Sequence, residues 1–250
     1  MEPQVYEQFS QLEDVHWWFC ARRHYISSIV KRLFGTDRQN LTFCEIGAGT
    51  GGNLPLLTRF AQVDAVEMND AARQMIESKS IAGLENLYSG YLPNDMPLLK
   101  VYDAVFCLDV VEHVENDVAA VAKLSTYVKD DGYLITTVPA YQWLWSAHDE
   151  ANHHFRRYTL DSYLELFQNT DLKIVYASYF NTLLFPLAAI SRSFQGLSNS
   201  ASSNSNKSLK LPNRVINFVL LKIFRLEAII AGRVKMPFGL SIIVVAQKLN

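Results

Sequence analysis

One stretch of the chain, FCEIGAGTGGN at residues 43–53, limits most strongly what the protein can fold into. It follows an apolar run rich in strand-forming residues, and an apolar segment comes after it, so it lies where a first strand turns into a first helix. Gly47, Gly49 and Gly51 allow the backbone to turn tightly and to approach a ligand without interference from a Cβ atom. A helix that follows such a loop presents oriented N–H groups. The pattern therefore predicts a ligand-binding loop at a strand end.

An acidic residue further along the chain supports this interpretation. Glu67 closes the second apolar run and stands 20 residues after Gly47. At this position of a dinucleotide-type fold, a carboxylate accepts hydrogen bonds from ribose hydroxyls. Read with Gly52, the loop also satisfies the pattern G-x-G-x-x-G. The loop and the acid together indicate a cofactor that contains adenosine, and they leave its other half undecided.

Short apolar runs recur along the chain with amphipathic stretches between them, which predicts βαβ units and a largely parallel sheet. Helices are expected over residues 70–80, 116–128 and 211–233. Apolar residues nearly surround the last of these helices, so it must pack against another element. The expected strands are residues 41–46, 63–68, 103–108, 133–138, 172–179 and 240–247.

Charge and cysteine content exclude some classes of partner. The 23 Lys and Arg residues against 25 Asp and Glu residues provide no excess positive field, so we predict no nucleic-acid partner. Cys20, Cys44 and Cys107 are odd in number and far apart, which indicates small buried hydrophobic residues in a reducing cytoplasm. The acidic start resembles no secretory signal, and no apolar run reaches the roughly 18 residues of a membrane span.

Two segments interrupt the alternation of strands and helices. Residues 142–158, QWLWSAHDEANHHFRRY, are dense in aromatic, histidine and arginine residues and too polar for a core element. Residues 196–208, GLSNSASSNSNKS, are rich in Ser and Asn and are expected to form a flexible loop.

Several motifs resemble those of the class I S-adenosylmethionine-dependent methyltransferases. EIGAGTG at residues 45–51 is similar to their first motif, and YDAVFCLDVVEHVEND at residues 102–117 is similar to their fourth-strand motif. HWWFCARRHYI at 16–26 and HHFRRYT at 153–159 resemble one bacterial branch of small-molecule enzymes. The resemblance implies S-adenosylmethionine as the cofactor and an α/β fold with a doubly wound, mostly parallel sheet of seven strands, the last one antiparallel.

The same resemblance suggests an organisation for the chain. Residues 1–250 would form a single methyltransferase domain. Residues 1–35 would be an N-terminal helical cap, and residues 180–235 a helical insertion before the last strand.

The resemblance also implies roles for individual residues. Glu45 supports the glycine loop and the amino end of the cofactor, Glu67 binds the ribose, and Met68 lies against the adenine. Tyr91 stands where many family members have an aspartate. The complete set of expected cofactor-binding residues is Trp18, Arg22, Glu45, Gly47, Ala48, Gly49, Gly51, Glu67, Met68, Tyr91, Leu92, Asp109 and Val110.

The acceptor side offers bases, aromatic rings and cations. A histidine is best matched to neutral pH as a base, and His113, His148 and His154 are the candidates, although each can equally be structural. The aromatic rings can face the cationic sulfur or simply pack, and the arginines can bind an anionic acceptor or brace the loop. The HDEANHH spacing fits no metal-ligand pattern, so we predict no metal. The expected acceptor-side residues are Tyr141, Trp143, Trp145, Arg156, Arg157 and Tyr158.

These features favour a methyltransferase that acts on a small-molecule acceptor, with oxygen as the target atom and with an apolar, lipid-linked or sugar-linked acceptor. The segment 180–235 can serve as a lid, as a homodimer surface or as a peripheral membrane contact of a cytoplasmic protein, which is then a monomer or a homodimer. An NAD(P)-dependent oxidoreductase is an alternative, because the glycine loop and Glu67 also satisfy that fingerprint. A non-catalytic binding protein that keeps the cofactor fold is another.

Overall fold

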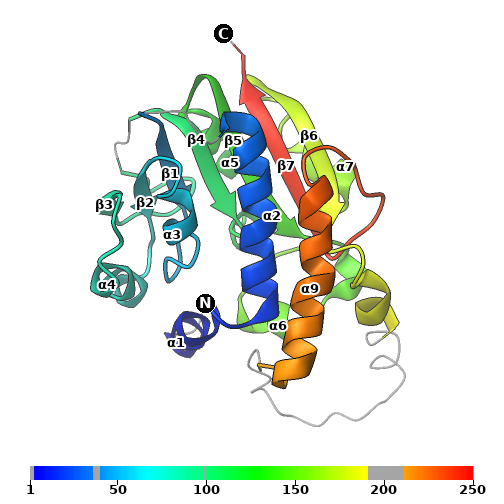
Figure 1. The fold of residues 1–250 in the computed structure, drawn as a ribbon. Helices are drawn as coiled ribbons and strands as arrows, with labels where there is room; N and C mark the ends of the chain where they lie inside the picture. Colours follow the sequence, from blue (N-terminus) through cyan, green and yellow to red (C-terminus); the bar gives the residue numbers. More distant parts are fainter. Residues whose placement is uncertain (1–2, 36–39, 98–99, 191–210, 250) are drawn as a thin grey trace.

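A computed structural model of the protein describes residues 3–35, 40–97, 100–190 and 211–249. Its centre is a seven-stranded sheet with the order β3-β2-β1-β4-β5-β7-β6 (Figure 1). Strands β1 to β5 run parallel, and β7 is antiparallel to both of its neighbours. The predicted doubly wound sheet with an antiparallel last strand is therefore confirmed. The strands are β1 (Thr42–Ile46), β2 (Gln62–Val66), β3 (Leu84–Tyr88), β4 (Tyr102–Leu108), β5 (Val128–Pro139), β6 (Leu172–Phe180) and β7 (Ser241–Lys248).

The central strands form where the sequence is almost continuously apolar. Residues such as Cys44 in β1, which pairs with Val105 in β4, are fully buried, as expected for a parallel strand covered on both faces. Strand β3 differs because it carries Glu85 and Asn86, both exposed, at the edge of the sheet. Because polar residues interrupt its sequence, β3 contains no apolar run, and the sequence alone does not indicate this strand.

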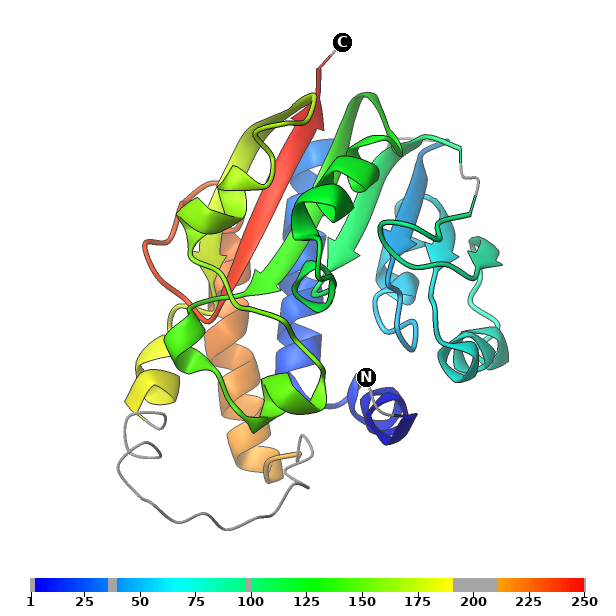
Figure 2. The same cartoon turned by 180° about the vertical axis from the view of Figure 1, so that it is seen from behind.

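Helices cover both faces of the sheet. Helix α2 (Trp17–Phe34) and helix α9 (Arg214–Ile230) lie side by side on one face (Figure 1). Helix α5 (Asp117–Ser125) and helix α7 (Leu160–Glu165) lie on the other (Figure 2). The remaining helical elements are α1 (Pro3–Leu12), α3 (Leu54–Leu57), α4 (Asp70–Ser78), η1 (Val111–His113), η2 (Gln142–Leu144) and α6 (Ala147–Ala151).

Helix α9 packs on α2 through one side only. The side chain of Asn217 accepts a hydrogen bond from the backbone N–H of Trp17 at 2.9 Å and donates one to the Val15 carbonyl at 2.8 Å. Phe224 is fully buried, whereas Val215 on the opposite side is 72% exposed. The broad apolar surface expected for this helix is thus half covered.

Two further expectations differ from the structure, and one cannot be compared with it. The expected helix over 116–128 ends at Ser125, and Val128 already belongs to β5, where it pairs with Tyr102. Residues 142–158 contain η2 and α6 and bury Asp149 completely, so the segment is more ordered than a polar loop. The Ser/Asn-rich stretch 196–208 lies outside the described residues.

The parallel strands place the functional edge. Strands β1, β4 and β5 all point their carboxyl ends toward the side of the sheet where α1 and α6 lie (Figure 1). In doubly wound sheets, ligands bind at this edge.

Candidate functional site

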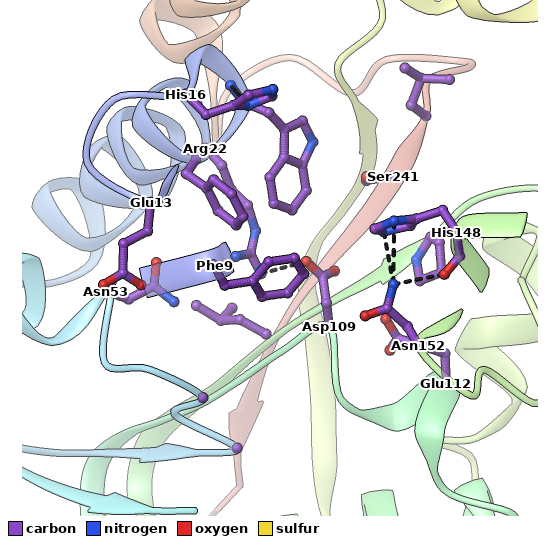
Figure 3. A pocket seen from close by; sticks show the side chains of 18 of the residues that line it. Phe9, Glu13, His16, Arg22, Asn53, Asp109, Glu112, His148, Asn152 and Ser241 are labelled. Carbon is purple, nitrogen blue, oxygen red and sulfur yellow. Dashed lines mark hydrogen bonds and ion pairs between the residues drawn. The ribbon is translucent and has the colours of Figure 1, made fainter. Parts of the chain in front are cut away.

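A cavity of about 490 Å³ opens at the carboxyl edge of the sheet. Helices α1 and α2 form one wall, the glycine loop forms a second, and the chain after β4 and β5 forms the third. Figure 3 shows Glu13 and Asn53 on one side of it and Glu112, His148 and Asn152 on the other, with Arg22 and Asp109 between them. One space therefore joins the glycine loop to a polar cluster.

The glycine loop leaves no room for side chains where it bends. Gly47 has a φ of 78°, and a Cβ atom there would lie 2.3 Å from Cγ2 of Val110. Gly51 has a φ of 85°, and its Cβ would lie 2.9 Å from Cγ1 of Ile76. Only glycine fits these two positions. Gly47, Ala48 and Gly49 line the cavity, so the loop backbone borders the space that the expected adenosine cofactor would occupy.

Glu67 holds the loop from the second strand. Its Oε2 accepts a hydrogen bond from the Gly49 N–H at 2.7 Å, and its Oε1 accepts one from the Asn69 N–H at 2.9 Å. Burial raises the pKa of Glu67 above its ordinary value, although these hydrogen bonds oppose the shift. An ionised carboxylate has about four lone-pair sites, so acceptor capacity remains for ribose hydroxyls.

Glu45 is a buried carboxyl group beneath the loop. It is 1% exposed, and its Oε1 accepts a hydrogen bond from Nδ2 of Asn53 at 2.8 Å. Its Oε2 has no hydrogen-bond partner among the described residues. Burial raises the pKa of Glu45 to about 7. An unpaired buried oxygen beside a cavity-lining residue fits a bound cationic or donor group, such as the amino end of the expected cofactor.

A buried ion pair lies between the two halves of the cavity lining (Figure 3). Nη2 of Arg22 lies 2.7 Å from Oδ2 of Asp109 and donates to Oγ1 of Thr137 at 3.0 Å. The Thr137 hydroxyl donates in turn to Oδ1 of Asp109 at 2.9 Å. Arg22 is 5% exposed, and the ring of Trp18 lies 5.1 Å from its Cζ. The pair is therefore internal, which excludes the surface ion pair that a helix arginine often forms.

The other expected cofactor residues divide into two groups. Six of the thirteen line the cavity, namely Trp18, Arg22, Gly47, Ala48, Gly49 and Asp109. The remaining seven lie outside the lining, namely Glu45, Gly51, Glu67, Met68, Tyr91, Leu92 and Val110. Of these, Met68 is 62% exposed and Tyr91 is 47% exposed, so both are surface residues outside the cavity lining.

All three candidate histidines line the far half of the cavity. Nδ1 of His154 donates to Oδ1 of Asp149 at 2.9 Å. Arg157 donates to both oxygens of the same carboxylate, from Nε to Oδ1 at 2.7 Å and from Nη2 to Oδ2 at 2.9 Å. Burial alone would raise the pKa of Asp149, but the hydrogen bonds from His154 and Arg157 hold it below its usual range. Burial, with the neighbouring His154, lowers the pKa of His113 to about 3.

Most of the other expected acceptor residues lie behind this wall. Arg157 lines the cavity, whereas Arg156 binds Oδ2 of Asp117 at 2.7 Å and the Glu115 carbonyl at 2.8 Å. Both arginines brace the segment, which is the structural alternative for them. Tyr158 is 4% exposed and donates to Asp117 at 2.8 Å. Tyr141, Trp143 and Trp145 lie outside the lining.

Sequence reasoning missed one buried acid in this half. Glu112 is fully buried and lines the cavity, and neither of its carboxylate oxygens has a hydrogen-bond partner among the described residues. Burial, followed by the charge of Asp109, raises the pKa of Glu112 well above its ordinary value. Glu112, His113 and His154 each offer a ligand atom within 4.8 Å of the others. The acid precedes His113 directly in the chain, and this adjacency was the only available signal.

Comparison with known proteins adds relatives to this geometry. A family model described as a methyltransferase domain matches residues 19–177. The chain is 34% identical over 120 residues to the ubiquinone biosynthesis O-methyltransferase of Rickettsia typhi, covering 46% of this chain and 47% of that one. It is 26% identical over 152 residues to the enzyme of the same name from Nitrosomonas europaea, covering 53% of this chain and 61% of that one. The chain thus spans about half the length of the curated relatives it matches.

A solved structure shows the same fold. An S-adenosylmethionine-dependent methyltransferase from Clostridium acetobutylicum superposes with a TM-score of 0.59 and 11% identity, over 91% of this chain and 92% of that one. Within residues 3–35, 40–97, 100–190 and 211–249, no helix is long and apolar enough to cross a membrane.

Proposed function

The chain belongs to the class I S-adenosylmethionine-dependent methyltransferase family, and on this premise we propose that it transfers a methyl group to a hydroxyl oxygen of a small-molecule acceptor. The observation that carries the proposal is the single cavity that connects the glycine loop with a histidine-rich polar half. Methyl transfer needs an acceptor and a donor aligned in one water-poor space more than it needs covalent machinery. The NAD(P)-dependent and non-catalytic alternatives leave this polar half without a role.

The glycine-loop half is proposed to hold the cofactor. S-adenosylmethionine, when bound, supplies an electrophilic methyl group on a positively charged sulfur. Glu67 would bind the ribose through its remaining lone pairs, and Glu45 would face the amino end. Met68 and Tyr91 would offer apolar surface to the adenine, since both side chains are exposed.

The Arg22 and Asp109 pair would fix the boundary between donor and acceptor. The side chains of Arg22 and Thr137 both bind the Asp109 carboxylate, and its φ of 58° turns the chain sharply after β4. A residue held this firmly orients a ligand without losing side-chain entropy when the ligand binds. Trp18 and Phe9 from the helical wall would exclude water on the same side.

The far half would receive the acceptor and take up its proton. We assign this proton to the imidazole of His148, because this side chain lines the polar half of the cavity and an imidazole nitrogen can act as a general base. His113, with its pKa lowered to about 3, is too weak a base at neutral pH. His154 donates from Nδ1 to Asp149, and its ring packs edge-on against the ring of His113, with the centroids 4.5 Å apart. Asn152 donates to the His148 carbonyl at 2.7 Å and contacts its ring at 3.3 Å, which positions the side chain.

The finer calls on organisation belong to the same proposal. Residues 1–35 would cap the site, since α1 and α2 form one cavity wall. Residues 180–235 would be an insertion into a single methyltransferase domain of residues 1–250. Helix α9 exposes Val215 and Ile229, so this segment would contact an apolar acceptor, a peripheral membrane surface or a second copy of the chain. The protein would work in the cytoplasm as a monomer or homodimer, without nucleic acid.

A transfer assay tests the proposal. The protein is incubated with S-adenosylmethionine labelled in its methyl group and a panel of hydroxylated small molecules, some lipid-linked and some sugar-linked. We expect label on an oxygen of at least one acceptor, identified by fragmentation in a mass spectrometer. Label found only on nitrogen or carbon would overturn the choice of target atom. No transfer to any acceptor would overturn the proposed activity.

A further inference from the structure

Among the described residues, Glu112 is the buried acid whose carboxylate has neither a hydrogen-bond partner nor an ion pair. The turn η1 places it at 0% exposure, and both carboxylate oxygens lack a hydrogen-bond partner among the described residues. Burying an unpaired carboxylate is unfavourable by several kcal/mol. A bound cation would offset this cost. The side chain also lines the cavity, so a ligand can reach it.

Two histidines converge on this acid from different elements. His113 follows Glu112 directly in η1, and His154 comes from the chain after α6. Their ring centroids lie 4.5 Å apart, and the ligand atoms of all three side chains lie within 4.8 Å of one another. A backbone hydrogen bond of 2.8 Å from the Phe155 N–H to the Glu112 carbonyl ties the two segments together. The cluster is therefore built into the fold.

Each histidine has a second group next to its ring. His154 donates from Nδ1 to Oδ1 of Asp149 at 2.9 Å, which leaves Nε2 unprotonated in the neutral ring. Asp149 is fully buried and held by Arg157. The backbone of Asn152 lies next to the ring of His113. Metal-binding histidines almost always donate their other ring N–H to a carboxylate or carbonyl in this way.

We propose that Glu112, His113 and His154 bind a divalent transition metal of the zinc class. Two imidazole nitrogens and one carboxylate oxygen form the ligand set of catalytic zinc sites that keep a fourth position open. The same set also suits other first-row divalent metals. All three residues line the cavity, so the open position faces the space that the acceptor would occupy.

The observed spacing needs only a small closure. Ligand atoms on a tetrahedral zinc ion lie roughly 3.3 Å apart, as follows from bonds of about 2.0 to 2.1 Å. The present limit of 4.8 Å therefore shortens by side-chain rotation when the ion binds. The prediction of no metal rested on spacing along the chain, and that spacing does not show this cluster, because His154 stands 41 residues after His113.

The metal would activate the acceptor hydroxyl. This role rests on the proposed function. A hydroxyl oxygen at the open position would have its pKa lowered by the ion. Its proton would pass to His148, which lies on the same wall of the cavity. The binding site itself stands on the three side chains and their partners, whatever reaction the protein performs.

Calorimetry with Zn²⁺ tests the site directly. Protein without an affinity tag is freed of metal with a chelator, and Zn²⁺ is titrated at neutral pH. We expect one ion per chain. Glu112→Gln should bind Zn²⁺ at least 100-fold more weakly. Asp149→Asn keeps the size of the side chain and removes the charge that orients His154, so it should bind about 10 to 100-fold more weakly. His24→Gln on the exposed side of α2 is the matched control and should bind like the unaltered protein.

A second readout separates the site from the proposed activity. Co²⁺ replaces Zn²⁺ and should give the intense visible absorption of a four-coordinate ion, which Glu112→Gln should abolish. S-adenosylhomocysteine is titrated into the same variant to show that the fold and the cofactor half persist. No stoichiometric uptake by the unaltered protein would overturn the metal site, as would equal Zn²⁺ affinity in Glu112→Gln. Metal uptake without any methyl transfer would instead leave the site standing and overturn the proposed function.

Discussion

The buried carboxyl group of Glu45 makes the free energy of unfolding depend on pH in a way that Glu45→Gln should remove. Its pKa is raised from 4.5 to about 7 by burial, so the folded protein holds a proton that the unfolded chain has lost. The stabilisation is fully present below the unfolded value of 4.5, and it is lost as pH rises through about 7. At 1.36 kcal/mol per pKa unit, the loss between pH 5 and pH 8 is about 2.5 kcal/mol.

Glutamine keeps the shape and still accepts the hydrogen bond that Asn53 donates to Oε1. Urea unfolding of the ligand-free protein at pH 5 and pH 8 measures the effect. We expect the unfolding free energy of the unaltered protein to fall by about 2.5 kcal/mol more than that of Glu45→Gln over this range. Equal changes in the two proteins would refute the reasoning, as would a greater fall in the variant.

The same substitution should weaken the binding of S-adenosylhomocysteine, because a charged acceptor makes hydrogen bonds of about 1.5 to 3 kcal/mol. This range corresponds to roughly 10 to 150-fold in affinity. Glu45→Gln should therefore be more stable at pH 8 than the unaltered protein but bind the cofactor product more weakly. This trade-off is expected where a buried charge serves ligand binding. Unchanged affinity would place the amino end of the cofactor elsewhere.

Three further substitutions test other parts of the site. Gly47→Val should abolish detectable cofactor binding in calorimetry, because a side chain there clashes with Val110. Gly35→Ala, at a similar φ of 71° but with open space around it, is the control and should leave binding intact. Equal effects of the two substitutions would discredit the loop assignment. Arg22→Ala leaves the carboxylate of Asp109 without its ion-pair partner and should lower the free energy of unfolding in urea by about 3 to 5 kcal/mol. Adding Asp109→Asn to this variant should restore part of the loss. An unchanged unfolding free energy in Arg22→Ala would argue against a buried pair. His148→Gln should slow methyl transfer by about 10² to 10⁴-fold in the labelled-methyl assay while cofactor affinity stays the same, and an undiminished rate would remove His148 as the base.

The parts of the fold that the sequence predicts are those with a strong local signal. The central strands are continuous apolar runs, and the glycine loop and Glu67 stand at a fixed spacing, so both were found without tertiary information. Strand β3 was not found, because an edge strand half exposed to solvent lacks an apolar run. The boundary between α5 and β5 was misplaced because Val128 suits a helix and a strand equally well by apolar periodicity.

The site follows the same division. Arg22 and Asp109 were each predicted, yet their mutual ion pair joins residues 87 positions apart and depends on how α2 crosses the end of β4. The His154, Asp149 and Arg157 interactions lie within one segment, but nothing in its spacing shows that the acid is fully buried. The only sequence signal for Glu112 is its position next to His113, because its burial depends on tertiary contacts of η1, such as the hydrogen bond from the Phe155 N–H to the Glu112 carbonyl.

The most direct test of the central claim is a calorimetric titration of the purified protein with S-adenosylhomocysteine, repeated with Glu67→Gln and with NADH as the competing ligand. We predict one site per chain for S-adenosylhomocysteine, at least tenfold weaker binding to Glu67→Gln, and no binding of NADH. Absence of S-adenosylhomocysteine binding, an affinity unaffected by the loss of the Glu67 charge, or tighter binding of NADH would each contradict the assignment of this cavity to a methyltransferase cofactor.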